Sequence, residues 1–182
     1  MERLNIVVVG PGASGKDFFR KNLLSLGYKP SISYTTRPPR EGEEDSIDYH
    51  FVCKEDFVNM IGDSFFYEWN YFAKSWYYGT PKSAFDGRYN LFIMTPSGVS
   101  ALSEEHRAKS IVVYINPEEN VRKTRLLARR DADLADRRLE TDRVDFCDFR
   151  DFDIEVNDAE FSVESILGRI KILEDEQKCL TS

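Results

Sequence analysis

Short apolar runs alternate with amphipathic segments along most of the chain, and this alternation predicts a sheet with helices packed against it. Buried strands are predicted where short, mostly apolar runs occur, at residues 6–9, 91–95, 110–115 and 154–157. Apolar residues at helical spacing predict helices at residues 19–26, 98–105, 118–130 and 163–173. Strands that alternate with helices in this way imply a parallel sheet covered on both faces.

The stretch from residue 28 to residue 80 departs from that pattern. Strand-like segments are predicted at residues 32–36, where Ile32, Tyr34 and Thr36 occupy every second position, and at residues 47–52. An extended turn at Pro38 and Pro39 separates the two segments. The following segments are predicted as a short helix at residues 54–63, an aromatic-rich strand at residues 65–72 and a returning loop at residues 76–80. We therefore expect a small antiparallel lobe inserted into the main body.

A glycine-rich segment with the pattern G-x-x-x-x-G-K directly follows the first predicted strand. Glycines let the backbone N–H groups of such a loop converge on a polyphosphate, and the lysine, Lys16, reaches the β- and γ-phosphates. An ordinary glycine-rich turn is the alternative, and the strand before the loop and the helix after it argue against that alternative. Asp17 stands where a serine or threonine would hold Mg²⁺. The sequence thus predicts a P-loop that binds ATP through Gly10, Pro11, Gly12, Ala13, Ser14, Gly15, Lys16 and Asp17.

Length and charge narrow the possible functions. A chain of 182 residues suits one α/β domain with excursions. Its net charge of −7 argues against binding to nucleic acid or to an anionic membrane, since both require a basic face. Positive charge for an anionic ligand gathers in two places, at Arg37 with Arg40 and in residues 122–143. No segment resembles a signal peptide or a membrane span, and we expect a cytoplasmic protein.

Two further segments carry a resemblance to a known family. Residues 33–43 read SYTTRPPREGE and residues 48–52 read DYHFV, and together with the P-loop they resemble the guanylate kinase family. The resemblance continues through residues 66–69 and 77–80, the Arg125-x-x-x-Arg129 spacing and residues 156–158, so it covers essentially the whole chain. It implies an α/β P-loop NTPase fold in three layers around a parallel sheet. It also implies one domain, residues 1–182, with its core at 1–32, 81–125 and 146–182, a monophosphate-binding lobe at 33–80 and a helical lid at 126–145.

Several residues match positions where the family binds its acceptor. The resemblance implies that Arg37, Arg40, Tyr49 and Tyr78 hold the acceptor's phosphate. It implies that Ser33, Glu68 and Thr80 bind the guanine base and that Thr95 lies near the acceptor nucleoside. Glu68 would discriminate between bases, because a carboxylate accepts hydrogen bonds from guanine N1–H and N2–H₂, which adenine does not offer. The alternatives are a salt-bridged Arg37 and Arg40 and a solvated Glu68, although the ordered set of matches favours binding.

On the donor side, the resemblance implies catalytic roles for Lys16, Arg125, Arg129 and Arg138 and an ATP-binding role for Asn157. Catalysis would consist of positioning and charge neutralisation, because the acceptor phosphate is already an ionised nucleophile. The remaining arginines are expected on a solvated helix face with alternating charges: Arg122, Arg130, Arg137 and Arg143.

The implied activity is transfer of the γ-phosphoryl group of ATP to GMP or dGMP, with Mg²⁺ as cofactor, small-molecule nucleotides as partners and a monomer or homodimer as the assembly. One alternative is a binding module that has lost catalysis and holds phosphorylated protein segments. Another is a kinase for a different monophosphate, deoxy or modified. The intact Gly10, Gly15 and Lys16 favour an enzyme, because a binding module has no physical need for them.

The sequence departs from the family pattern at three positions: Asp17 replaces a hydroxyl, Thr95 replaces an aspartate after a core strand, and Ser46 replaces a glycine. One hypothesis is that Asp17 and Thr95 have exchanged carboxylate and hydroxyl, so that Asp17 faces the metal ion. The competing hypothesis is that Asp17 only stabilises the helix N-terminus, by about 0.3–1 kcal/mol, and that metal binding is weaker.

Overall fold

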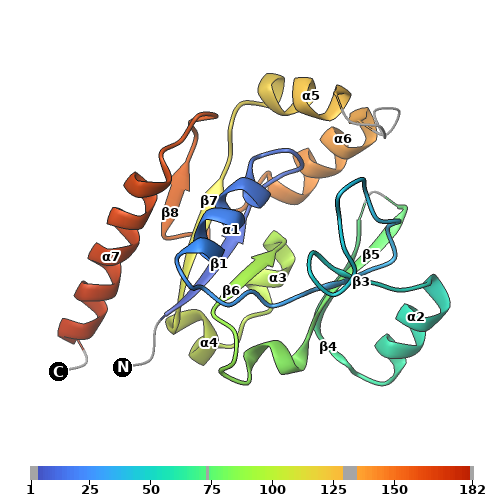
Figure 1. Ribbon diagram of the computed structural model, residues 1–182, viewed down its shortest axis with the longest axis horizontal. Coiled ribbons are helices and arrows are strands. Elements are labelled where there is room, and N and C mark those ends of the chain that lie inside the picture. The colour runs from blue at the N-terminus through green and yellow to red at the C-terminus, as the bar shows by residue number, and fades with distance from the viewer. Residues whose placement is uncertain (1–3, 73, 129–134, 181–182) are drawn as a thin grey trace.

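The computed structural model describes residues 4–72, 74–128 and 135–180, and its main body is built on a four-stranded sheet (Figure 1). This sheet has the order β6-β1-β7-β8 and consists of β1 (Asn5–Val9), β6 (Leu91–Met94), β7 (Ser110–Ile115) and β8 (Ile154–Val156). Every neighbouring pair of strands runs parallel. The predicted core strands and their parallel arrangement are therefore confirmed, within one residue at the strand ends.

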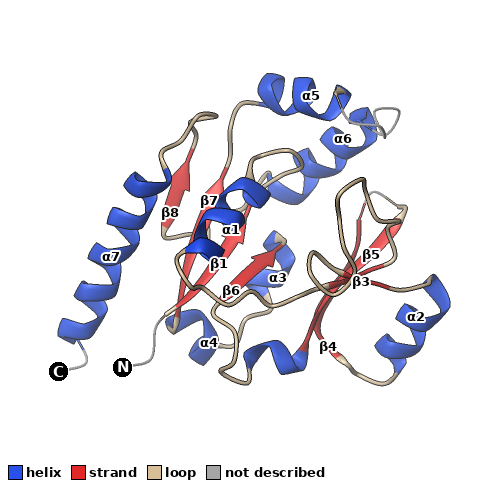
Figure 2. Ribbon diagram, in the orientation of Figure 1, coloured by secondary structure: helices blue, strands red, loops and turns tan. Residues whose placement is uncertain are grey.

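Helices cover both faces of this sheet (Figure 2). They are α1 (Lys16–Ser25), α3 (Pro96–Ser100), α4 (Glu104–Ala108), α5 (Glu119–Leu127), α6 (Ala135–Phe146) and α7 (Val163–Leu180). On one face Val8 belongs to an apolar cluster with Phe19 of α1 and Ile166 of α7. On the other face Val7 belongs to a cluster with Val99 of α3. Because successive strand residues point to opposite faces, an unbroken apolar strand such as β1 must be covered on both sides.

A second, smaller sheet forms the inserted lobe. It has the order β3-β2-β5-β4, with β2 (Tyr34–Thr35), β3 (His50–Phe51), β4 (Phe66–Phe72) and β5 (Trp76–Pro81), followed by the short 3₁₀ helix η1 (Lys82–Phe85). Phe57 of α2 (Lys54–Gly62) stacks on Phe66 of β4, with ring centroids 4.4 Å apart. Gly79 permits this packing, because a Cβ there would lie 2.7 Å from the Phe66 ring. The lobe therefore has an aromatic core of its own.

Two features of the lobe differ from the prediction. Residues 76–80 belong to a strand rather than a loop, because they pair antiparallel with β4, with Trp69 opposite Gly79. Strands β2 and β3 run parallel, so the lobe is mixed rather than wholly antiparallel. The strand-like segments predicted at residues 32–36 and 47–52 contain only two strand residues each.

The predicted helices of the second half also need correction. The helix expected at residues 98–105 is divided into α3 and α4, because the Ser103 hydroxyl accepts a hydrogen bond from the His106 N–H (3.2 Å) and begins a new helix. The helix expected at residues 118–130 ends at Leu127, and a later charged segment, residues 135–146, forms α6. Helix α6 lies between α5 and the small lobe in Figure 1. Within the described ranges, no helix has both the length and the apolar character needed to cross a membrane.

Candidate nucleotide-binding site

The loop between β1 and α1 has the backbone geometry that its glycines predict. Gly10 is buried against β7, and a Cβ on it would lie 2.4 Å from the Ile115 carbonyl oxygen. Gly15 caps α1 with a φ of 108°, which a residue with a side chain rarely adopts. The Ser14 hydroxyl is buried and has no hydrogen-bond partner in the described part of the chain. The loop therefore places an unsatisfied hydroxyl donor directly before a helix N-terminus, where an anion can bind.

Lys16 lies across the mouth of this loop. Its Nζ donates to the carbonyl oxygens of Gly10 (2.6 Å) and Pro11 (2.9 Å). The ammonium group is thus held beside the backbone N–H groups of the loop. A phosphate bound there would meet both kinds of donor.

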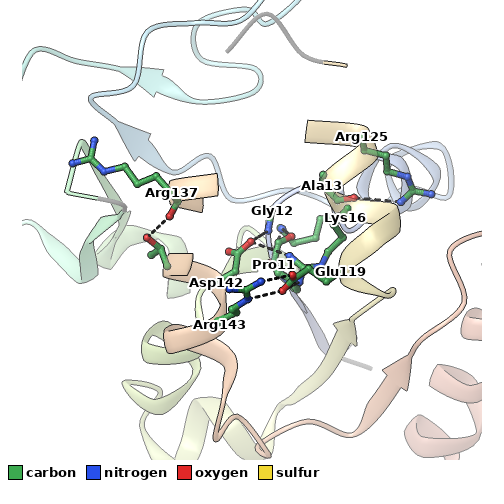
Figure 3. Close-up of polar contacts among 12 residues, drawn as sticks. Pro11, Gly12, Ala13, Lys16, Glu119, Arg125, Arg137, Asp142 and Arg143 are labelled. Carbon is green, nitrogen blue, oxygen red and sulfur yellow. Dashed lines mark hydrogen bonds and ion pairs between the residues drawn. The ribbon is translucent and has the colours of Figure 1, made fainter. Parts of the chain in front are cut away.

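Helix α6 contributes a buried carboxylate to the same loop. The sequence analysis did not predict this carboxylate. Asp142 is 2% exposed and accepts a hydrogen bond from the Gly12 N–H (2.9 Å), as Figure 3 shows. It also forms an ion pair with Arg122 (3.1 Å). Burial raises the pKa of Asp142, while the Gly12 N–H and the charges of Lys16 and Arg122 oppose that rise. This contact fixes one face of α6 against the P-loop.

The arginines of residues 122–143 occupy different environments. Arg122 was expected on a solvated face, and this is wrong: it is 6% exposed because its guanidinium is paired with Asp142. Arg143 is exposed and paired with Glu119 (2.6 Å), in agreement with the prediction. Arg137 is exposed as well, and it donates to the Ser75 hydroxyl of the small lobe (3.3 Å). Arg129 and Arg130 lie outside the described residues.

Arg125 and Arg138 line two different cavities beside the P-loop. Arg125 donates to the Ala13 carbonyl oxygen (3.3 Å) and the Ala159 carbonyl oxygen (2.9 Å), and it lines a second cavity together with loop residues 13–17. Arg138 is 3% exposed and lines the large cleft between the P-loop and the small lobe. The structure thus brings both predicted arginines to cavities that the loop lines.

The expected phosphate-binding groups of the acceptor gather at the small lobe. Arg40, Tyr49 and Tyr78 line the large cleft, and the two tyrosine rings lie 6.0 Å apart. Burial and the nearby Tyr78 raise the pKa of Tyr49, so its hydroxyl stays protonated. Arg37 lies deeper, paired through NH2 with Glu43 (2.8 Å), but its buried Nε–H has no hydrogen-bond partner among the described residues. The alternative of salt-bridged arginines is therefore partly correct, because Arg37 and Arg40 are both paired with Glu43.

The expected base-binding groups lie at the far end of the same cleft. Ser33, Glu68 and Thr95 line it, and Thr80 is buried behind Glu68. The Thr80 hydroxyl donates to Glu68 Oε1 (2.7 Å), and burial raises the pKa of the Glu68 carboxyl group. Glu68 is therefore turned into the cleft rather than fully solvated.

The residues predicted to bind the metal ion and ATP differ in their contacts and in their distance from the P-loop. Asp17 is exposed in the first turn of α1 and lines both cavities. The Thr95 hydroxyl accepts from the Gly98 N–H (3.1 Å) and so caps α3. The amide of Asn157, at the end of β8, can donate to the Asn116 carbonyl oxygen (3.2 Å). Its part in ATP binding stays a prediction.

The parallel sheet, the strand–loop–helix cradle and the lysine at its mouth define an α/β protein with a P-loop NTPase fold. A family model described as "Guanylate kinase" matches residues 2–171. The chain belongs to the guanylate kinase family, which is a family of kinases.

Individual relatives support this assignment. The chain is 31% identical to a guanylate kinase of Bacillus cereus over 90% of this chain and 85% of that protein. It is 31% identical to one of Prochlorococcus marinus over 91% of this chain and 96% of that protein. It is 46% identical to the guanylate kinase of Schizosaccharomyces pombe over a shorter segment, which covers 40% of this chain and 37% of that protein. The crystal structure of guanylate kinase from Anaplasma phagocytophilum has the same fold, with a TM-score of 0.69 at 22% identity over 97% of this chain and 88% of that one.

Proposed function

We propose that this protein transfers the γ-phosphoryl group of ATP to GMP or dGMP, giving ADP and GDP or dGDP. One observation carries the proposal: a single cleft is lined at one end by the P-loop and Lys16 and at the other by Ser33 and Glu68. Arg40 and Tyr78 line the same cleft. A nucleoside monophosphate bound with its base at Glu68 would direct its phosphate toward the P-loop.

The proposed acceptor site divides its work between charge and orientation. Arg40 would attract the phosphate, while the hydroxyl groups of Tyr49 and Tyr78 would orient it without adding charge. Because Tyr49 remains protonated, it can donate a hydrogen bond to a phosphate oxygen. In this proposal the nucleophile is an ionised oxygen of the acceptor phosphate, so no general base is required.

The proposed donor site neutralises the phosphates of ATP. Lys16 would leave the Gly10 and Pro11 carbonyl groups and bind the β- and γ-phosphates. Arg138, from the lid helix, would face the transferring group from the opposite side of the cleft. Arg125 would contact ATP from the second cavity, which it lines together with the P-loop. The proposal includes the predicted division of the chain into a core, a monophosphate-binding lobe at residues 33–80 and a lid at residues 126–145.

Asp17 is the group that fits Mg²⁺. No group of three or more acidic, histidine or cysteine side chains in the described ranges could hold a metal ion on its own. Mg²⁺ is usually held by one or two carboxylates together with substrate phosphates and water, so a single exposed carboxylate beside the P-loop suffices. Bound there, the ion would neutralise charge on the β- and γ-phosphates. Asp142 is a poorer candidate, because its buried carboxylate already binds both the Gly12 N–H and Arg122 through Oδ2.

Asp17→Asn tests this assignment, because it removes the charge and keeps the size. We expect the Mg²⁺ concentration for half-maximal turnover to rise about tenfold, since one of the few protein ligands is weakened. The matched control is Asp56→Asn, which removes an exposed carboxylate from the first turn of α2, away from the cleft. Both variants should lose a similar small helix-dipole stabilisation in thermal unfolding. An unchanged Mg²⁺ dependence in Asp17→Asn would leave Asp17 with the helix role alone.

Steady-state ADP release tests the function as a whole. ATP and Mg²⁺ are supplied with GMP, dGMP, AMP, CMP, UMP or dTMP in parallel. We expect turnover with GMP or dGMP and little with the others. Preferred turnover of another monophosphate would identify a kinase with changed base preference. Binding of GMP without turnover of any acceptor would identify a binding module.

A further inference from the structure

The lid helix and the small lobe contact each other at one edge of the cleft. Trp76, the first residue of β5, belongs to the small lobe, whereas Arg138 belongs to the lid helix α6. The guanidinium carbon of Arg138 lies 5.2 Å from the centre of the Trp76 ring, within the range of a cation–π contact. Both side chains line the cleft between the P-loop and the acceptor site.

Neighbouring contacts fix this meeting point from both sides. One residue before Arg138, Arg137 donates to the hydroxyl of Ser75, which directly precedes Trp76. Figure 3 shows Arg137 extending from α6 away from the P-loop, while Asp142 on the same helix extends toward it. Asp142 accepts from the Gly12 N–H one turn after Arg138. Arg138 is thus placed between a contact with the P-loop and a contact with the small lobe.

We propose that Trp76 is a positioning residue for Arg138. The indole face holds the guanidinium in the cleft, where it meets the phosphoryl group during transfer. Arginine has a long, rotamer-rich side chain, so a surface that orients it before the reaction lowers the entropy lost when it binds phosphate. Because the indole belongs to the small lobe, Arg138 is aligned only when lobe and lid lie together.

The second tryptophan of the chain provides a comparison. Trp69 lies on the neighbouring strand β4, is 47% exposed and does not line the cleft. Its ring lies against Tyr77, with centroids 6.0 Å apart. Within the described residues no cation is found over the Trp69 ring. A tryptophan that only supports the lobe would resemble Trp69 rather than Trp76.

The inference rests on the proposed phosphoryl transfer, and its test uses Trp76→Leu, Trp76→Phe and Trp69→Leu with GMP as acceptor. Leucine keeps apolar bulk and removes the aromatic face, so we expect kcat to fall about 3- to 30-fold while KM for GMP changes less. Phenylalanine restores an aromatic face and should recover most of kcat. Trp69→Leu should match the parent chain. Thermal unfolding midpoints separate these effects from loss of the fold.

Two further measurements decide between positioning and simple packing. In an Arg138→Ala background, Trp76→Leu should cause no further loss of kcat, since no guanidinium remains to be positioned. In a Trp69→Phe chain, Trp76 is the sole tryptophan, and Arg138→Leu should shift its fluorescence emission. An equal loss of kcat in both backgrounds, or unchanged emission, would overturn the inference.

The same measurements distinguish a failure of this inference from a failure of the proposed phosphoryl transfer on which it rests. If no monophosphate is turned over by the parent chain, phosphoryl transfer fails as the function, and the emission shift alone judges the Trp76–Arg138 contact. If Arg138→Ala lowers kcat and Trp76→Leu does not, the kinase stands and only the positioning role falls.

Discussion

Lys16→Ala is expected to lower kcat/KM for ATP-dependent phosphorylation of GMP by about 10³-fold, which corresponds to about 4 kcal/mol of transition-state stabilisation. The ammonium group already lies at the mouth of the P-loop, 2.6 Å from the Gly10 carbonyl oxygen. On transfer, negative charge shifts onto the oxygen that bridges the β- and γ-phosphates, where Lys16 would donate. Alanine leaves the loop backbone intact, so ATP should still bind, more weakly. Steady-state turnover and direct ATP binding, measured together, separate these two effects.

Lys21→Ala is the matched control for this change. Lys21 lies on the same helix, α1, but is exposed and lines neither cavity. The two variants lose the same charge from the same helix, so any difference between them comes from the position of Lys16. Turnover that remained within a few-fold of the parent in Lys16→Ala would remove the P-loop from the proposed chemistry.

The strand–loop–helix unit around Lys16 could be predicted because its determinants are local. The unbroken apolar strand, the glycine at positive φ and the apolar spacing of α1 all lie within residues 5–25. Each constraint acts on the backbone of the residue that carries it or on its near neighbours. The parallel core sheet follows from the same logic, because its strands are short, apolar and separated by helices.

The parts that could not be predicted depend on partners distant in sequence. Arg122 and Asp142 each look like solvated helix charges, and only their pairing across 20 positions buries both. Asp142 does carry a weak signal, because it lies one turn from Arg138 on the buried side of α6. The strand β5 was missed for a similar reason: its aromatic residues carry no polar alternation, and the pairing with β4 makes it a strand. Tertiary contacts of this kind override local propensity.

The acceptor site could be predicted only in part. The ordered set of residues around Arg37 indicated phosphate binding, yet Arg37 itself is largely used by Glu43. Glu43 accepts from the Arg37 guanidinium and from the Arg40 backbone N–H (2.7 Å), so it holds the two arginines in one cluster. Sequence spacing could not predict that Glu43 joins the two arginines, and the phosphate-binding roles of Arg37 and Arg40 stay predictions.

Glu68→Gln is expected to lower the preference for GMP over AMP, as the ratio of kcat/KM values, by about 10²-fold. A carboxylate accepts hydrogen bonds from both guanine donors, and hydrogen bonds to charged groups contribute about 1.5–3 kcal/mol each. Glutamine replaces one acceptor oxygen by an NH₂ group, which would face a guanine donor. Thr80 can still donate to the remaining oxygen, as it does to Glu68 Oε1 (2.7 Å), so the side chain should keep its orientation. Glu55→Gln, on the exposed face of α2, removes a carboxylate from the same lobe without touching the cleft.

The pH dependence of this preference provides an independent check on Glu68. Burial raises the pKa of its carboxyl group above the ordinary glutamate range, so protonation begins at a higher pH than for a solvated glutamate. A protonated carboxyl group loses one acceptor and gains a donor, as glutamine does. The preference of the parent chain for GMP should therefore fall as pH is lowered through this raised pKa, whereas that of Glu68→Gln should stay flat. If both proteins showed the same pH profile, or if Glu68→Gln kept the full preference for GMP, guanine would have to be bound by other groups in the cleft.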